Sequence, residues 1–153
     1  MFTSIIDPSL AGCSDLEVLV GVNDAQISQQ IVDTLLELDC KVYPARDPQD
    51  AMSKLQFHSF PVVILQEGYS MEMMQILACL PMSIRRNIFY VMIGNNLETG
   101  NAMHSFVLST NFVLNVKDVG NFGKIFKNAL LNNNRFYRPF YQSMEKITKE
   151  RNS

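Results

Sequence analysis

The stretch Phe60-Pro-Val-Val-Ile-Leu-Gln66 contains a continuous apolar run, residues 62–65, with no alternation of apolar and polar residues. Such a run is typical of a strand that is covered on both faces, as in a parallel sheet. Four further apolar runs, rich in β-branched or aromatic residues, occur at residues 18–22, 41–43, 88–93 and 112–114. The sequence therefore predicts five short strands of one buried sheet.

The segments between these strands carry apolar residues at helical spacing. Ile27, Ile31 and Leu35 predict a helix over about residues 25–39. Asp47 and Pro48 suit the N-cap and the first position of a second helix. Three more helices are expected around residues 73–80, 102–107 and 122–130. Strands that alternate with helices predict right-handed crossovers and a three-layer α/β sandwich around a parallel sheet.

Length and composition fit one folded domain. The chain has 153 residues, of which 47% are apolar and 18% charged, and this excludes a wholly disordered protein. Residues 16–131 are expected to form the domain, residues 1–15 an irregular leader, and residues 132–153 a C-terminal helical extension. The first residues do not resemble a secretory signal, and no apolar run approaches the roughly 20 residues of a membrane span. A cytoplasmic protein is therefore expected.

The sequence offers little for metal, cofactor or covalent chemistry. Cys13, Cys40 and Cys79 include no CxxC pair, whereas zinc sites and disulfide frameworks need closer or paired spacing. Cys40 and Cys79 are expected to be buried small hydrophobic residues. The glycines near residues 94 and 120–123 lack the spacing of a phosphate-binding loop, and the loop after the first strand is unsuited to an FMN phosphate. We expect no enzymatic activity, no cofactor and no bound metal.

Charge is unevenly distributed along the chain. Residues 1–84 carry 3 basic and 11 acidic side chains, and residues 85–153 carry 10 basic and 4 acidic ones. Such a split can mark an anionic partner, but the basic residues form no block and are expected to be solvated helix faces. The 22 residues after Leu131 are too few for a helix-turn-helix or zinc finger, so no direct nucleic-acid binding is expected.

Four segments resemble the receiver domain of response regulators, which has the flavodoxin-like fold. They are Val18-Leu-Val-Gly-Val-Asn-Asp24, Asp39-Cys-Lys-Val42, Phe60-Pro-Val-Val-Ile-Leu-Gln66 and Phe112-Val-Leu-Asn-Val116. The resemblance covers about residues 16–131. It implies a flavodoxin-like (βα)5 sandwich with a parallel five-stranded sheet, and a site at the carboxyl ends of the strands.

In receiver domains, carboxylates after the first and third strands hold magnesium, and the third-strand aspartate accepts a phosphoryl group. A hydroxyl residue and a lysine, at the ends of strands four and five, hold that group. The matching positions here are Val22 and Asn23 for the acid pair, with Asp24 next to them, Gln66 for the acceptor, Gly94 for the hydroxyl residue and Asn115 for the lysine.

These replacements predict a pseudo-receiver, which keeps the fold without the phosphoacceptor. Gln66 carries a neutral amide, which neither attacks phosphorus usefully nor binds a hard dication as a carboxylate does. The adjacent Glu67 is expected to point to the other face of the sheet. Two interpretations of the vacated pocket stay open: a neutral hydrogen-bonded cluster, which we favour, and the binding site of a small-ligand sensor.

The function expected from this resemblance is phosphorylation-independent protein interaction in bacterial signalling, with a partner protein or a second copy of the chain. The predicted surface comprises the fourth helix, fifth strand, fifth helix and tail, with Met103, Phe106, Phe122, Phe126, Phe136, Tyr137, Phe140 and Tyr141. In the tail, Tyr137, Phe140, Met144 and Ile147 share one helical face. That face has to be covered, by the chain's own domain or by another chain, and the sequence leaves both open.

Overall fold

The computed structural model describes residues 15–133. The predicted leader, apart from Asp15, and all of the extension beyond residue 133 lie outside the described residues. Within residues 15–133, no helix is long and apolar enough to cross a membrane.

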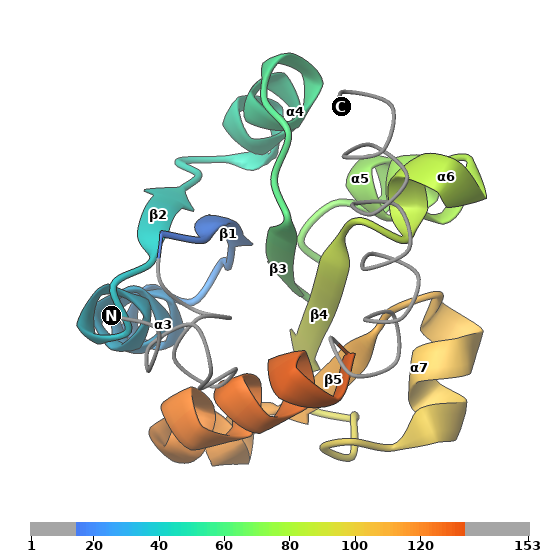
Figure 1. Cartoon of the computed structure of the whole chain (residues 1–153). Coiled ribbons are helices and arrows are strands. Elements are labelled where there is room, and N and C mark those ends of the chain that lie inside the picture. Colours follow the sequence, from blue (N-terminus) through green and yellow to red (C-terminus); the bar gives the residue numbers. More distant parts are fainter. Residues whose placement is uncertain (1–14, 134–153) are drawn as a thin grey trace, which may run out of the picture.

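Five parallel strands form one sheet in the order β2-β1-β3-β4-β5, which confirms the predicted sheet (Figure 1). The strands are β1 (Glu17–Gly21), β2 (Lys41–Pro44), β3 (Val62–Gln66), β4 (Phe89–Gly94) and β5 (Phe112–Asn115). All four strand pairs are parallel. Four consecutive residues of β3 are buried because helices cover both faces of the sheet, and this explains the continuous apolar runs.

The helices alternate with the strands as predicted. They are α3 (Ala25–Glu37), α4 (Pro48–Phe57), α5 (Met71–Ala78), α6 (Met82–Arg85) and α7 (Ala102–Leu108), followed by the 3-10 turn η1 (Val116–Asn121) and a final helix over residues 122–133. This final helix continues across residues 131–132, where the domain was expected to end. Asp47 caps α4 by accepting from the Asp50 amide at 2.7 Å, with Pro48 as its first residue, as predicted.

Two apolar cores lie on opposite faces of the sheet. Alternate residues Val18 and Val20 of β1 pack with α3 and the final helix, whereas Leu19 packs with residues of α4 and α5. Figure 1 shows the final helix in orange and α3 in blue at one side, and α4, α5, α6 and α7 at the other. The molecule is therefore a three-layer α/β sandwich with the flavodoxin-like strand order.

The structure corrects two expectations about burial. Cys40 is buried as expected, but Cys79 is exposed, because it caps the end of α5 where the chain turns away from the core. Phe122 and Phe126 stack on each other with ring centroids 5.2 Å apart and are each only 2% exposed. Their assignment to an interaction surface was wrong, since both side chains fill the core between the final helix and the sheet.

Candidate functional site

The fold brings most of the predicted pocket residues to one edge of the sheet. Gln66, Gly94 and Asn115 end three adjacent strands, and the pairings Gln66 with Ile93 and Gly94 with Asn115 align their carboxyl ends. Asn23 and Asp24 follow β1, which pairs with β3. Val22 is only partly buried and packs against the core beside α3, so it contributes no polar group to this edge.

Gln66 bridges the ends of β3 and β1 through its side chain. Its Oε1 accepts hydrogen bonds from the backbone N–H groups of Asn23, at 2.8 Å, and Asp24, at 3.1 Å. The backbone carbonyl of Gln66 accepts from the Tyr69 N–H at 2.9 Å. The amide oxygen thus holds the loop after β1 against the end of β3.

Asp24 has a structural task of its own, as the N-cap of α3. Its Oδ1 accepts from the N–H groups of Gln26 at 2.9 Å and Ile27 at 3.2 Å. These donors are among the first N–H groups of the helix, which have no partner within the helix. One oxygen of this carboxylate is therefore committed to the helix terminus.

Gly94 lies beneath the side chain of Glu67. A Cβ atom at Gly94 would come within 2.9 Å of Glu67 Oε1 and within 3.1 Å of Leu97 Cδ1. The Glu67 N–H donates to the Ile93 carbonyl at 2.7 Å, which extends the contact between β3 and β4 by one residue. A hydroxyl-bearing residue at position 94 therefore has no room unless these two side chains shift.

Asn115 connects the loop after β4 with the turn after β5. Its Nδ2 donates to the carbonyls of Leu97, at 2.7 Å, and Asn95, at 3.2 Å, while its Oδ1 accepts from the Lys117 N–H at 2.9 Å. The bond from the Lys117 N–H makes Asn115 the N-cap of η1.

Sequence reasoning missed the second half of this network. The Asn115 N–H donates to Thr99 Oγ1 at 2.9 Å, and the Thr99 hydroxyl donates to a carboxylate oxygen of Asp118. A sequence signal existed at Asn115, because asparagine is a preferred N-cap residue, but nothing local linked it to Thr99.

Tyr69 adds a buried hydroxyl below this edge. Burial raises the pKa of Tyr69, and the nearby carboxylates of Asp47 and Asp50 raise it further. Its hydroxyl has no hydrogen-bond partner among the described residues. Its ring requires glycine at the end of β1, since a Cβ at Gly21 would come within 2.8 Å of Tyr69 Cε2.

The residues at this edge do not fit a magnesium ion. Residues 15–133 contain no cluster of three or more carboxylate, histidine or cysteine side chains that could hold a metal. Asp24 caps α3, Glu67 lies over Gly94, and the strand ends carry amides and a glycine. Magnesium prefers octahedral coordination by carboxylates and water, and this set supplies too few carboxylates.

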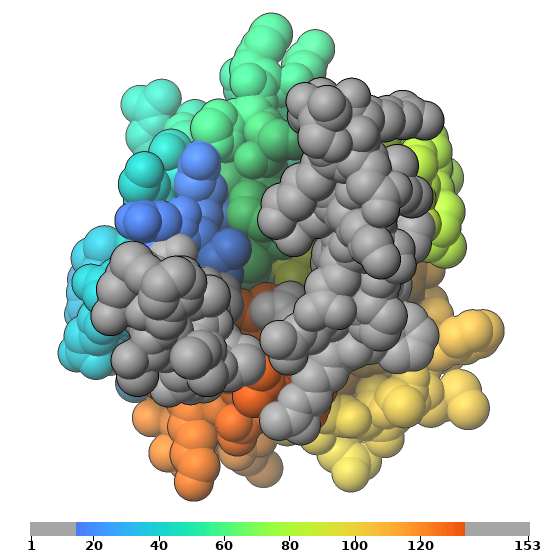
Figure 2. Space-filling view, in the orientation of Figure 1, coloured from blue at the N-terminus to red at the C-terminus, as the bar shows by residue number. Residues whose placement is uncertain are grey.

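The predicted interaction residues of α7 lie on the surface. Met103, Phe106 and Val107 are 66%, 82% and 69% exposed, and we call them the α7 patch. In Figure 2 the helix, drawn in yellow, stands out at one edge of the molecule. None of the residues of α7 is buried, so its apolar stripe faces solvent instead of the sheet. The tail residues Phe136, Tyr137, Phe140 and Tyr141 lie outside the described part of the chain.

Comparison with known proteins identifies the fold. No family model matches the chain, and no curated protein does. The similar solved structures include the chemotaxis response regulator CheY4 of Vibrio cholerae, with 16% identity, a TM-score of 0.55, and 73% of this chain and 99% of that chain covered. A Francisella response regulator receiver domain matches with 17% identity and a TM-score of 0.60, covering 77% of this chain and 98% of that one.

A third match is the signal receiver domain of a DNA-binding response regulator from Colwellia psychrerythraea 34H. Its identity is 19% and its TM-score 0.55, with 66% of this chain and 85% of that chain covered. At these identities the likeness establishes architecture alone. The chain has the receiver fold, with an edge of the sheet whose polar groups bond to one another.

Proposed function

We propose that this protein is a phosphorylation-independent protein-interaction module of signal transduction, a pseudo-receiver in a bacterial two-component type of pathway in the cytoplasm. The observation that carries the proposal is the Gln66 side chain, whose Oε1 accepts from two backbone N–H groups. The resemblance to receiver domains matches this position to the phosphoacceptor. An amide oxygen held in this way is a poor nucleophile, and the site lacks the carboxylates that hold magnesium.

A receiver switches when an acyl phosphate favours one arrangement of its output face. Gly94 offers no hydroxyl to sense such a group, and Asn115 is engaged by the loop after β4. We therefore expect the output face to hold one arrangement, with no phosphate-dependent change. Among residues 15–133, we assign partner binding to the α7 patch, since exposed methionine and aromatic side chains supply large and adaptable contacts.

A phosphoryl-analogue experiment tests the first half of the proposal. The full chain is incubated with magnesium and beryllofluoride, and separately with a small phosphodonor, and is then examined by intact mass and fluorine NMR. We expect no adduct. Any stoichiometric adduct on the folded chain would overturn the proposal.

A surface variant tests the second half. Phe106→Ser changes an 82% exposed residue of the patch, and Leu36→Ser changes a 56% exposed residue of α3 as a matched control. We expect Phe106→Ser to weaken capture of a partner, or self-association measured by light scattering, at least tenfold, with Leu36→Ser unchanged. Equal behaviour of both variants and the native chain would show that the α7 patch is not the interface.

The alternative function, a small-ligand sensor in the vacated pocket, is less well supported. The side chains of Gln66 and Asn115 already bond across the loops that would have to open for a ligand. A thermal-shift screen of nucleotides and metabolites separates the two functions, because a ligand that binds the folded state raises the melting temperature. A rise of several degrees that Gln66→Leu abolishes would favour the sensor.

A further inference from the structure

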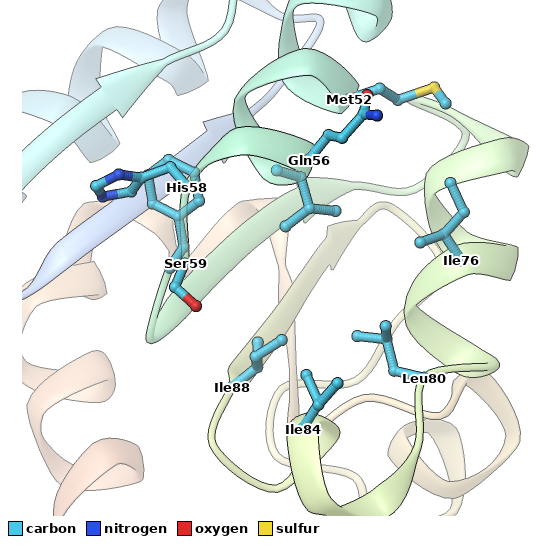
Figure 3. Close-up of a pocket in the computed structure, with 10 residues that line it drawn as sticks. Met52, Gln56, His58, Ser59, Ile76, Leu80, Ile84 and Ile88 are labelled. Carbon is cyan, nitrogen blue, oxygen red and sulfur yellow. The ribbon is translucent and has the colours of Figure 1, made fainter.

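An apolar groove lies between α4, α5 and α6 (Figure 3). Phe60 and Ile88, which line it, precede β3 and β4, so the groove lies at the end of the sheet opposite to Gln66. Its volume is about 350 Å³, and its lining comprises Met52, Leu55, Gln56, His58, Ser59, Phe60, Ile76, Leu80, Ile84 and Ile88. The side chains of Ile84, Ile88 and Leu80 point toward the space that Met52 and Gln56 border from α4. Ile76 and Ile84 are 41% and 50% exposed, so the groove presents apolar surface that nothing in residues 15–133 covers.

A second hollow, of about 530 Å³, adjoins this groove between α6 and α7. Leu80 lines both hollows, and we refer to the two together as the path. The lining also includes Met82, which is 72% exposed, and Thr110, whose buried hydroxyl has no hydrogen-bond partner among the described residues. The path thus combines exposed apolar side chains with an unpartnered polar atom.

The described chain ends beside this path. Asn133, in the last turn of the final helix, accepts from Asn111 Nδ2 at 3.5 Å, and Asn111 lines the second hollow. Twenty residues, 134–153, follow Asn133 in the sequence. At 1.5 Å per residue, a helical segment of that length spans about 30 Å, with a bend expected at Pro139.

We propose that residues 134–153 of the same chain occupy the groove between α4, α5 and α6. The segment carries Tyr137, Phe140, Met144 and Ile147 at the spacing of one helical face, and this apolar stripe matches the apolar lining of the groove. Because the segment is tethered at the rim of the path, its effective concentration there is on the order of millimolar, well above that of a second copy in dilute solution. This docking of residues 134–153 in the groove does not depend on the function proposed above.

A single-tryptophan reporter tests the occupancy, since the natural chain contains no tryptophan. Phe140→Trp places the reporter on the apolar stripe of the full chain. Gln142→Trp places a control reporter on the opposite side of the predicted helix. We expect Phe140→Trp to emit at shorter wavelength and to be quenched by acrylamide at least twofold less than Gln142→Trp.

Groove variants then identify the docking site. Ile76→Ser with Ile84→Ser should raise the quenching of Phe140→Trp at least twofold, whereas Leu36→Ser, on the opposite face of the sheet, should leave it unchanged. Both changes are at exposed positions, and circular dichroism confirms that the variants fold. Water-like emission from Phe140→Trp, or quenching that the groove variants do not alter, would overturn the proposal. Protection that grows with protein concentration together with a dimeric mass would overturn it in favour of a second copy.

Discussion

At the scale of single residues, Gln66 places a hydrogen-bonded amide, not a carboxylate, at the end of β3. The sequence predicted its position at the end of a buried strand and its lack of a carboxylate. It did not predict that Oε1 would accept from both Asn23 and Asp24, because these bonds depend on how the loop after β1 folds back. The preferred interpretation, a neutral hydrogen-bonded cluster, agrees with these bonds and with those of Asn115.

Replacing Gln66 separates its structural role from a chemical one. Gln66→Leu should lower the free energy of unfolding by about 1–2 kcal/mol, because two N–H groups lose their acceptor at a partly hydrated edge. Gln66→Glu keeps the oxygen in place and should stay within about 0.5 kcal/mol of the native chain. Urea unfolding followed by circular dichroism measures both, and equal stability of Gln66→Leu and the native chain would contradict the structural role.

The burial of Tyr90 predicts that the folded state loses stability at alkaline pH. Burial raises the pKa of Tyr90 to about 12, although the Arg85 guanidinium over its ring lowers it somewhat. The unfolded chain releases this proton near pH 10, before the folded chain does, so the stability contributed by the neutral phenol is complete below pH 10. It is lost as pH rises toward 12, by about 2–3 kcal/mol.

The variant Tyr90→Phe removes this titration. The native Tyr90 hydroxyl has no hydrogen-bond partner among the described residues, so the variant should lose little stability at pH 7. Chemical denaturation at pH 7 and pH 11 should show a smaller alkaline loss for Tyr90→Phe than for the native chain. Identical losses would mean that other groups cause the alkaline transition.

At the scale of helices and strands, local sequence patterns predict which elements exist but not how deeply their side chains are buried. The apolar runs predicted all five strands, because a strand covered on both faces cannot alternate. Phe106 and Phe126 both sit on helices in apolar patterns, yet one is 82% exposed and the other 2%. Periodicity gives the apolar side of a helix, whereas the depth at which that side packs is set by neighbouring elements.

The cap of α3 offers a prediction at this scale. Asp24→Ala removes the acceptor for two N–H groups of the first turn and should cost about 1 kcal/mol. Asp33→Ala, an exposed aspartate inside the same helix whose side chain accepts from Gln29, is the matched control and should cost less than half as much. Thermal and urea unfolding compare the two, and equal costs would contradict the capping role.

At the scale of the whole molecule, the carboxyl-terminal edge of the sheet is joined by hydrogen bonds between loops that follow different strands. The fold class was predictable because five β-α units in sequence admit few arrangements of a parallel sheet. The linkage of Asn115 to Thr99 and Asp118 was not predictable, since it joins two segments that are separated in the chain by α7 and β5. Long-range polar contacts of this kind depend on the assembled sheet.

Magnesium removal is the corresponding test of the intact protein. Stability should be the same in excess EDTA and in millimolar magnesium, within about 1 °C in melting temperature, because ions stabilise only the states to which they bind. A magnesium-dependent rise of several degrees, abolished by Asp24→Asn, would place an ion at this edge and overturn the expectation that no metal binds there.

The two hydrogen bonds of Gln66 also constrain how this sequence can change. An aspartate at position 66 has a side chain one methylene shorter, so it would release at least one of the N–H groups that Gln66 holds. It would still lack a second free carboxylate, a hydroxyl at Gly94 and a lysine at Asn115. The change Gln66→Asp is therefore expected to cost stability without completing a receiver-type site.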